Sequence, residues 1–198
     1  MPHSRVTPST PSPSDVDVTR EELHSRHIEM RGYRRSDGLF EVEGRVTDRK
    51  PHDFVPGGIG EMVPANRPIH DMGVRLVFDE QMVVLGVHTF SDAVPYAACI
   101  GGGEALQALK GLHISNGWSR EVRSRLGGAR SCTHLMELLI PMATAAFQSM
   151  TVTRKGHPER LDAHGRPTKI DSCYAYAAHR DLVQQRWPAF HRPLPPEE

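Results

Sequence analysis

Alternating apolar and polar positions predict four strands in the first half of the chain. Segments 26–35 and 39–48 alternate on either side of Ser-Asp-Gly, a sequence typical of a short turn between paired strands. Segment 69–79 alternates between an apolar and a more polar face, and segment 82–90 is almost continuously apolar, as expected of a central strand. These patterns predict two strand pairs.

The longest apolar stripe lies in segment 127–150 and predicts the main helix. Its apolar residues recur at three- and four-residue steps, the spacing that places one face of a helix on a core: Leu135, Leu138, Leu139, Met142, Ala146 and Met150. Ser131 and Thr133 are favourable N-cap types, so the helix is expected to begin within a residue or two of Cys132. Pro141 is expected to kink or split it. Shorter helices are predicted over 104–110, 117–126 and 177–187.

The pattern as a whole predicts one α+β domain, an antiparallel sheet with helices packed on one face. We expect residues 1–20, which lack apolar periodicity, to form a disordered tail, residues 21–190 a single domain and residues 191–198 a C-terminal tail. Segment 51–68 holds four prolines and three glycines, which predicts a long loop that covers the functional site.

Composition limits the classes of function. The 198 residues contain 24 Lys and Arg against 24 Asp and Glu, so no overall charge recruits nucleic acid. The sequence shows no secretory signal and no membrane span, and a cytoplasmic protein is expected. Its three cysteines are odd in number and widely spaced, which favours ligand or nucleophile roles over disulfides.

The cysteines and their neighbours form the candidate site. One interpretation is a metal site for Zn or Fe, with Cys99, Cys132, Cys173, His70 and Asp71 as ligands, since thiolates with one harder ligand suit these metals. The alternation in 69–79 places His70 on the core face and Asp71 on the other face.

A second interpretation makes Cys132 a nucleophile with His134 or His70 as its base. A thiol in the first turn of a helix is expected to have a lowered pKa, because free N–H groups and the helix dipole favour an anion there. The enzyme would act on an acyl or carbonyl substrate, with Arg120 or Arg123 binding a carboxylate or phosphate. A pocket open to Cys132 would favour this enzyme, and a closed site a structural metal.

A third interpretation is a binding or assembly module in which the cysteines only fill the core. The ligand would be a small molecule or a protein, with neither nucleic acid nor membrane as a partner. The sequence does not specify the substrate, the partner or whether the chain forms a homo-oligomer.

Several motifs, in order, resemble those of the bacterial domain-of-unknown-function family 2889 (DUF2889). They are Gly-Tyr-Arg-Arg within 31–39, Ile-His-Asp-Met at 69–72, Gly-Trp-Ser-Arg-Glu-Val-Arg within 117–128, Ser-Cys-Thr-His-Leu at 131–135 and Asp-Ser-Cys-Tyr-Ala at 171–175. The resemblance spans about 24–190. It implies no established reaction, but its motifs include the positions of Cys99, Cys132, Cys173 and His134.

The chain is also similar, more faintly, to the iron–sulfur scaffold fold of the NifU and IscU type. There a strand pair leads to a cysteine loop and then to a cysteine at the head of a long, Ala-rich helix. On this resemblance Cys99 and Cys132 match two scaffold cysteines, and His70 falls close to the scaffold's aspartate. It implies a scaffold-like core with an added N-terminal hairpin, and a metal or reactive-sulfur site.

Overall fold

The computed structural model describes residues 18–153 and 158–194. The chain divides into two compact units, residues 1–151 and residues 152–198. This boundary falls inside the single domain expected for 21–190. Most of the tail expected for 1–20 lies outside the described residues.

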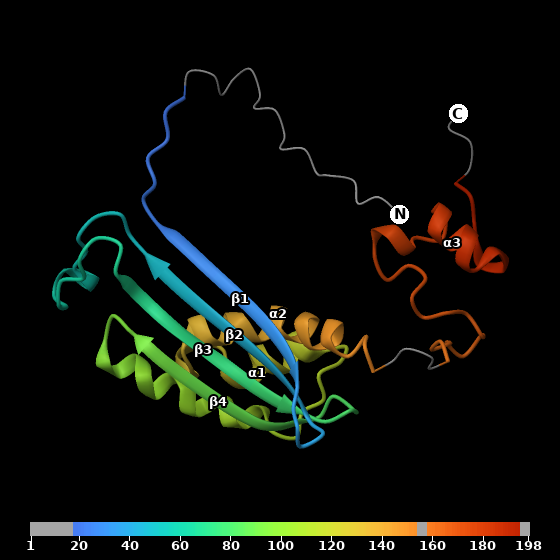
Figure 1. Ribbon diagram of the computed structural model, residues 1–198, viewed down its shortest axis with the longest axis horizontal. Coiled ribbons are helices and arrows are strands. Elements are labelled where there is room, and N and C mark those ends of the chain that lie inside the picture. The colour runs from blue at the N-terminus through green and yellow to red at the C-terminus, as the bar shows by residue number, and fades with distance from the viewer. Residues whose placement is uncertain (1–17, 154–157, 195–198) are drawn as a thin grey trace. The chain divides into compact units, whose positions relative to one another are not determined.

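Four strands form one antiparallel sheet in the first unit. They are β1 (Ser25–Arg34), β2 (Phe40–Arg49), β3 (Pro68–Phe78) and β4 (Val84–Ala93), and they lie side by side in chain order (Figure 1). The predicted strands are confirmed to within a few residues at each end. Each connection joins neighbouring strands. Because side chains alternate along a strand, every second residue of each strand points to the same face of the sheet.

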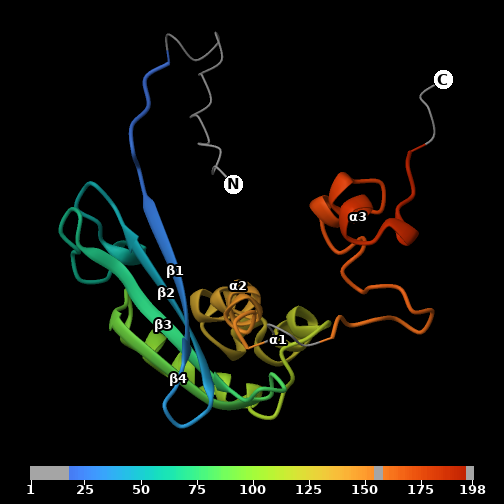
Figure 2. The ribbon, with the colours of Figure 1, turned by 45° about the vertical axis from the view of Figure 1, so that its right-hand side comes forward.

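Helices cover one face of this sheet, as Figure 2 shows for α1 (Trp118–Leu126) and α2 (Thr133–Ser149). A run of 3₁₀ turns, η3 (Ala97–Leu109), packs beside β4 and takes the place of the short helix expected at 104–110. Helix α2 begins next to Cys132, as predicted, although the N-cap is Cys132 itself and neither Ser131 nor Thr133. α2 runs through Pro141 as one helix. The predicted α+β class, with helices on one face, is therefore confirmed.

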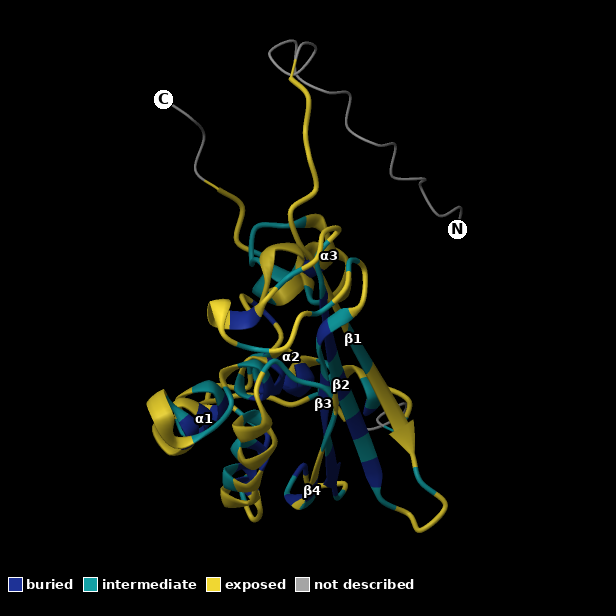
Figure 3. Ribbon diagram, turned by 90° about the vertical axis from the view of Figure 1, so that its left-hand side faces the viewer, coloured by how far each residue is buried: buried dark blue, intermediate teal, exposed yellow. Residues whose placement is uncertain are grey.

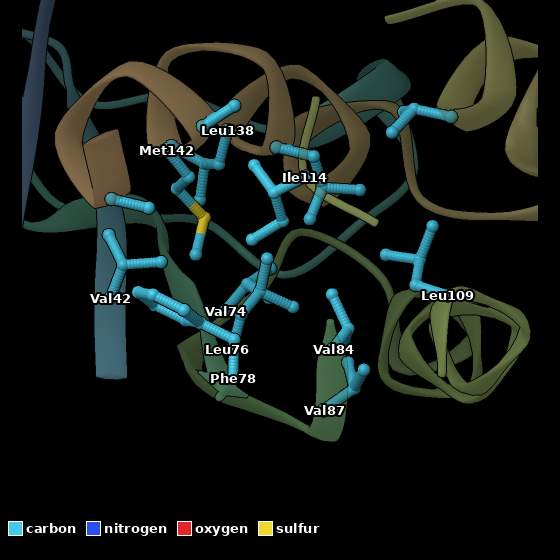
Figure 4. Close-up of a cluster of buried hydrophobic side chains, with 14 of the residues drawn as sticks. Val42, Val74, Leu76, Phe78, Val84, Val87, Leu109, Ile114, Leu138 and Met142 are labelled. Atoms are coloured by element: carbon cyan, nitrogen blue, oxygen red, sulfur yellow. The ribbon is translucent and has the colours of Figure 1, made fainter. Parts of the chain in front are cut away.

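The core lies between the sheet and these helices (Figure 4). Its fully buried side chains come from both layers: Val42, Val74, Leu76, Phe78, Val84, Leu109, Ile114, Leu138 and Met142. Burial alternates along β2, while β1 is largely exposed (Figure 3). The other face of the sheet carries ion pairs such as Arg45 with Asp71 and Arg75 with Glu43. The helix-facing side is therefore the one that can bury a site.

A glycine allows α2 to approach the middle of the sheet. A Cβ atom at Gly44 would lie 2.9 Å from Cγ and Sδ of Met142 and 3.0 Å from Sδ of Met30. Met142 is completely buried, so its side chain has little room to move. The absence of a side chain at Gly44 thus sets the spacing between sheet and helix.

The second unit has its own short elements. Helix α3 (Asp181–Arg186) is followed by Trp187, which packs on Tyr176 and donates a hydrogen bond to Glu159. α3 is shorter than the helix expected over 177–187. Among the described residues, no helix is long and apolar enough to cross a membrane.

Replacing Gly44 with Ala is expected to lower the free energy of unfolding by about 1–3 kcal/mol, because the added Cβ overpacks the core at Met142. Urea denaturation measures this change. Gly101→Ala is the matched control, since a Cβ there meets nothing within 4 Å. Equal stabilities of the two variants would contradict this account of Gly44.

Candidate functional site

Three polar residues form a row across the helix-facing side of the sheet, at the end where β1 begins. Arg26 of β1 pairs with Asp48 of β2, and Asp48 pairs with His70 of β3. The same face carries Val42 and Val46 further along β2. The row therefore continues the apolar face of the sheet with groups that need polar partners.

Asp48 is the centre of this row, and its side chain is only 2% exposed. Arg26 binds the carboxylate with two hydrogen bonds, Nε to Oδ1 at 2.8 Å and Nη2 to Oδ2 at 2.9 Å. Nε2 of His24 lies 3.4 Å from Oδ1. Burial alone would raise the pKa of Asp48, but the hydrogen bonds and charge of Arg26 outweigh it and lower the pKa below its ordinary value. Asp48 is therefore a carboxylate at neutral pH.

His70 lies on the other side of Asp48 and is mostly buried. Its Nδ1 is 3.0 Å from Oδ2 of Asp48, but the approach is out of line for a hydrogen bond, so this buried nitrogen has no hydrogen-bonding partner. Burial, and next the neighbouring His134, lower the pKa of His70. We therefore treat His70 as a neutral imidazole with an available nitrogen.

The start of α2 brings a thiol to this end of the sheet. The backbone N–H of Cys132 donates to the carbonyl of Gly102 at 3.1 Å, which fixes the N-cap against η3. A Cβ at Gly102 would lie 2.9 Å from the backbone nitrogen of Cys132. The absence of a side chain at Gly102 thus permits close packing at the head of α2. Sγ of Cys132 lies 3.8 Å from Sδ of Met72.

His134 lies between the thiol and the carboxylate. Its Nδ1 is 4.0 Å from Sγ of Cys132, and its Nε2 is 4.0 Å from Oδ2 of Asp48. Its ring packs on that of His70, with centroids 3.9 Å apart. The hydrogen bond with Cys132 is the main cause of a raised pKa at His134, which burial only partly offsets. A thiol, an imidazole and a carboxylate thus follow one another, with 4.0 Å between the facing atoms of each neighbouring pair.

Opposing effects act on the thiol of Cys132. Burial is the largest single effect and raises its pKa, but the hydrogen bond with His134 and those from the backbone N–H groups of Leu135 and His134 together lower it. This agrees with the pKa expected of a thiol in the first turn of a helix. Cys132 and His134 are therefore poised to exchange a proton.

An open cavity of about 820 Å³ reaches this thiol. Segments 54–57, 69–70, 95–102 and 129–134 contribute its lining, which includes Cys99, Cys132 and both histidines. The first of these segments belongs to the loop expected to cover the site. The volume falls in the range of small-molecule sites, and most of the lining is apolar.

Asp48, His70 and His134 also form a cluster that could hold a metal ion. One ligand atom from each lies within 4.8 Å of the other two, and among the described residues no other group of three or more such ligands is this close. The cysteines are outside this group, although Cys132 is adjacent to it. An imidazole binds a metal in its ring plane, so the packed rings, tilted by 35°, would have to turn to share an ion.

Four other predicted site residues are not among those that line the cavity. Asp71 accepts hydrogen bonds from Arg45 and Thr47 and does not line the cavity. Cys173 lies in the second unit and is exposed. Arg120 and Arg123 belong to α1, and neither is among the cavity-lining residues.

Sequence analysis did not identify Asp48 or Arg26 as parts of the site. It did not single out Arg130 from the basic cluster of Arg120, Arg123, Arg125 and Arg130, which it interpreted as a solvated face or as substrate-anion contacts. Arg130 lines the cavity two residues before Cys132. A signal for Asp48 was present: it shares the parity of Phe40, Val42 and Val46 on a predicted strand, and a carboxylate on a core face requires a partner.

The family comparison covers the part of the chain that holds this site. Residues 24–148 match the family described as "Protein of unknown function (DUF2889)". No curated protein and no solved structure matches the chain. The NifU- and IscU-like core consequently stays a prediction.

Asp48→Asn is expected to lower the free energy of unfolding by about 2–3 kcal/mol at pH 7, because Arg26 loses the carboxylate that it binds with two hydrogen bonds. The folded-state pKa of Asp48 is lowered, so its contribution is complete above the ordinary pKa of about 3.9 and is lost as the pH falls through the folded value. Urea denaturation across that range should show the two proteins converging. Glu80→Gln, at an exposed position, is the control; a difference that is independent of pH would contradict this role of Asp48.

Proposed function

Because this chain belongs to the DUF2889 family, whose description names no reaction, we propose from its own geometry that Cys132 is the nucleophile of an enzyme acting on acyl compounds. One observation carries the proposal. The Cys132–His134–Asp48 array lies at the head of a helix and opens into a cavity of about 820 Å³. A thiol that only filled the core would need neither the imidazole nor the opening.

The proposed reaction uses three neighbouring groups, the thiol of Cys132, the imidazole of His134 and the carboxylate of Asp48. The Cys132 thiolate attacks the carbonyl carbon of an ester or thioester, and a carbon–sulfur bond forms. As the bond to the leaving group breaks, His134 gives that group its proton. His134 then takes a proton from water, which attacks the acyl-enzyme and releases the acid and the free thiol. Asp48 stabilises the imidazolium during both steps.

A second candidate is a divalent metal site at Asp48, His70 and His134, favoured by the close approach of their three ligand atoms. Two imidazoles and a carboxylate suit Zn²⁺ or Fe²⁺. Cys132 is close enough to this group to take part in a metal-dependent reaction. This site would use Nε2 of His134, the nitrogen that faces Asp48 in the thiol mechanism.

The enzyme proposal predicts fast alkylation of Cys132 near neutral pH. Iodoacetamide should label Cys132 faster than the exposed Cys173 in the same protein, as followed by peptide mass spectrometry. His134→Gln should slow labelling of Cys132 by about tenfold, because the imidazole no longer favours the thiolate. His113→Gln, at an exposed position, is the matched control.

Acyl transfer is the second readout of the same variants. With p-nitrophenyl acetate, the wild-type protein should acquire an acetyl group on Cys132 that the His134→Gln protein gains far more slowly. If the cysteines react with neither iodoacetamide nor p-nitrophenyl acetate, the enzyme proposal is wrong and a structural role for the cysteines is favoured.

The metal candidate predicts near-stoichiometric Zn²⁺ or Fe²⁺ in protein purified without chelator under anaerobic conditions. His70→Ala should remove the metal, because it deletes a ligand whose buried nitrogen has no other hydrogen-bonding partner. Elemental analysis measures the content, with His113→Ala as the control. Metal that persists in the His70→Ala protein, or protein that binds neither ion when it is added, would rule out this site.

A further inference from the structure

Among the described residues, the cavity is lined by one arginine and by no carboxylate. That arginine, Arg130, carries the one permanent charge of the described lining. The walls are otherwise built largely from apolar side chains such as Phe54, Ile69 and Tyr96. The nearby carboxylate of Asp48 is already bound by Arg26, so it repels an entering anion little.

Arg130 is held in position but has free donors. Its Nε donates to the carbonyl of Gly127 at 3.0 Å, which anchors the root of the guanidinium. Its terminal amino groups make no hydrogen bond and no ion pair with any residue in the described parts of the chain. Many of the other arginines of the first unit, such as Arg26, Arg45 and Arg75, bind carboxylates. A guanidinium left without a carboxylate at a cavity is suited to an anionic ligand.

We propose that Arg130 binds the anionic group of the substrate, a carboxylate or phosphate, while Cys132 attacks the acyl carbon. The inference rests on the proposed function and adds its substrate class: a largely apolar acyl compound with one anionic group. Arg130 lies two residues before Cys132, so the anion and the reacting carbonyl share one wall of the cavity. The sequence suggested this role for Arg120 or Arg123, but Arg130 is the arginine that lines the cavity.

Two alkylating reagents of nearly equal size, one anionic and one neutral, test this binding. Each forms a carbon–sulfur bond to Cys132 with loss of iodide, but iodoacetate is an anion and iodoacetamide is neutral. The measured quantity is the ratio of their rates at Cys132, divided by the same ratio at the exposed Cys173. This ratio should fall about tenfold in Arg130→Gln, which removes a charge-assisted hydrogen bond. Arg130→Lys should retain part of the preference.

Control variants separate the local effect from the net charge. Arg34→Gln makes the same charge change at an exposed position at the far end of β1 and should leave the ratio unchanged. A ratio that is also unchanged in Arg130→Gln would overturn the proposal. So would a preference that disappears in Arg123→Gln but survives in Arg130→Gln. Slow labelling by both reagents in the wild-type protein would instead contradict the nucleophile itself.

Direct binding tests Arg130 without relying on thiol reactivity. In Cys132→Ser protein, butyrate, its neutral counterpart butyramide and inorganic phosphate are titrated at constant ionic strength, and binding is followed by NMR. Butyrate should bind more tightly than butyramide, and Arg130→Gln should weaken it by about tenfold. Tighter binding of phosphate than butyrate would identify a phosphate-bearing substrate. Equal binding of butyrate and butyramide, with no binding of phosphate, would overturn the anion site.

Discussion

The buried carboxylate of Asp48 is the constraint around which this end of the molecule is arranged. A charge that is removed from water must be compensated by close, well-oriented partners, or it becomes protonated. Arg26 supplies two hydrogen bonds from the neighbouring strand, and the imidazoles of His70 and His134 complete its surroundings. The antiparallel pairing of β1, β2 and β3 holds Arg26, Asp48 and His70 in one row.

The candidate site forms because helix α2 begins next to this row. The N-cap of α2 places the thiol of Cys132 among free backbone N–H groups, and His134, the second residue of the helix, faces Asp48. Gly102 permits the close contact that fixes this helix start. The thiol, the imidazole and the carboxylate thus come from elements held by the core. Geometry of this kind can be maintained while a ligand enters and leaves.

The sequence predicts what depends on local spacing and leaves out what depends on pairing across strands. The strands, the start of α2 and the Cys132–His134 pair follow from periodicity and capping within a few residues. Asp48 joins them only through strand register and the packing of α2, which no local pattern specifies. Asp71 differs from Asp48 in this respect, because the alternation along 69–79 already indicates that it lies on the face opposite His70, where it binds Arg45.

The two candidate chemistries compete for one atom of His134. A thiolate–imidazolium pair needs a proton on each ring nitrogen, one facing Cys132 and one facing Asp48, whereas a metal needs the lone pair of Nε2. The bidentate contact with Arg26 already uses both oxygens of Asp48 and places a positive charge beside any cation. Metal binding would have to overcome that repulsion and turn two packed rings. Thiol chemistry needs only a small closing movement of His134, which is why the geometry favours it.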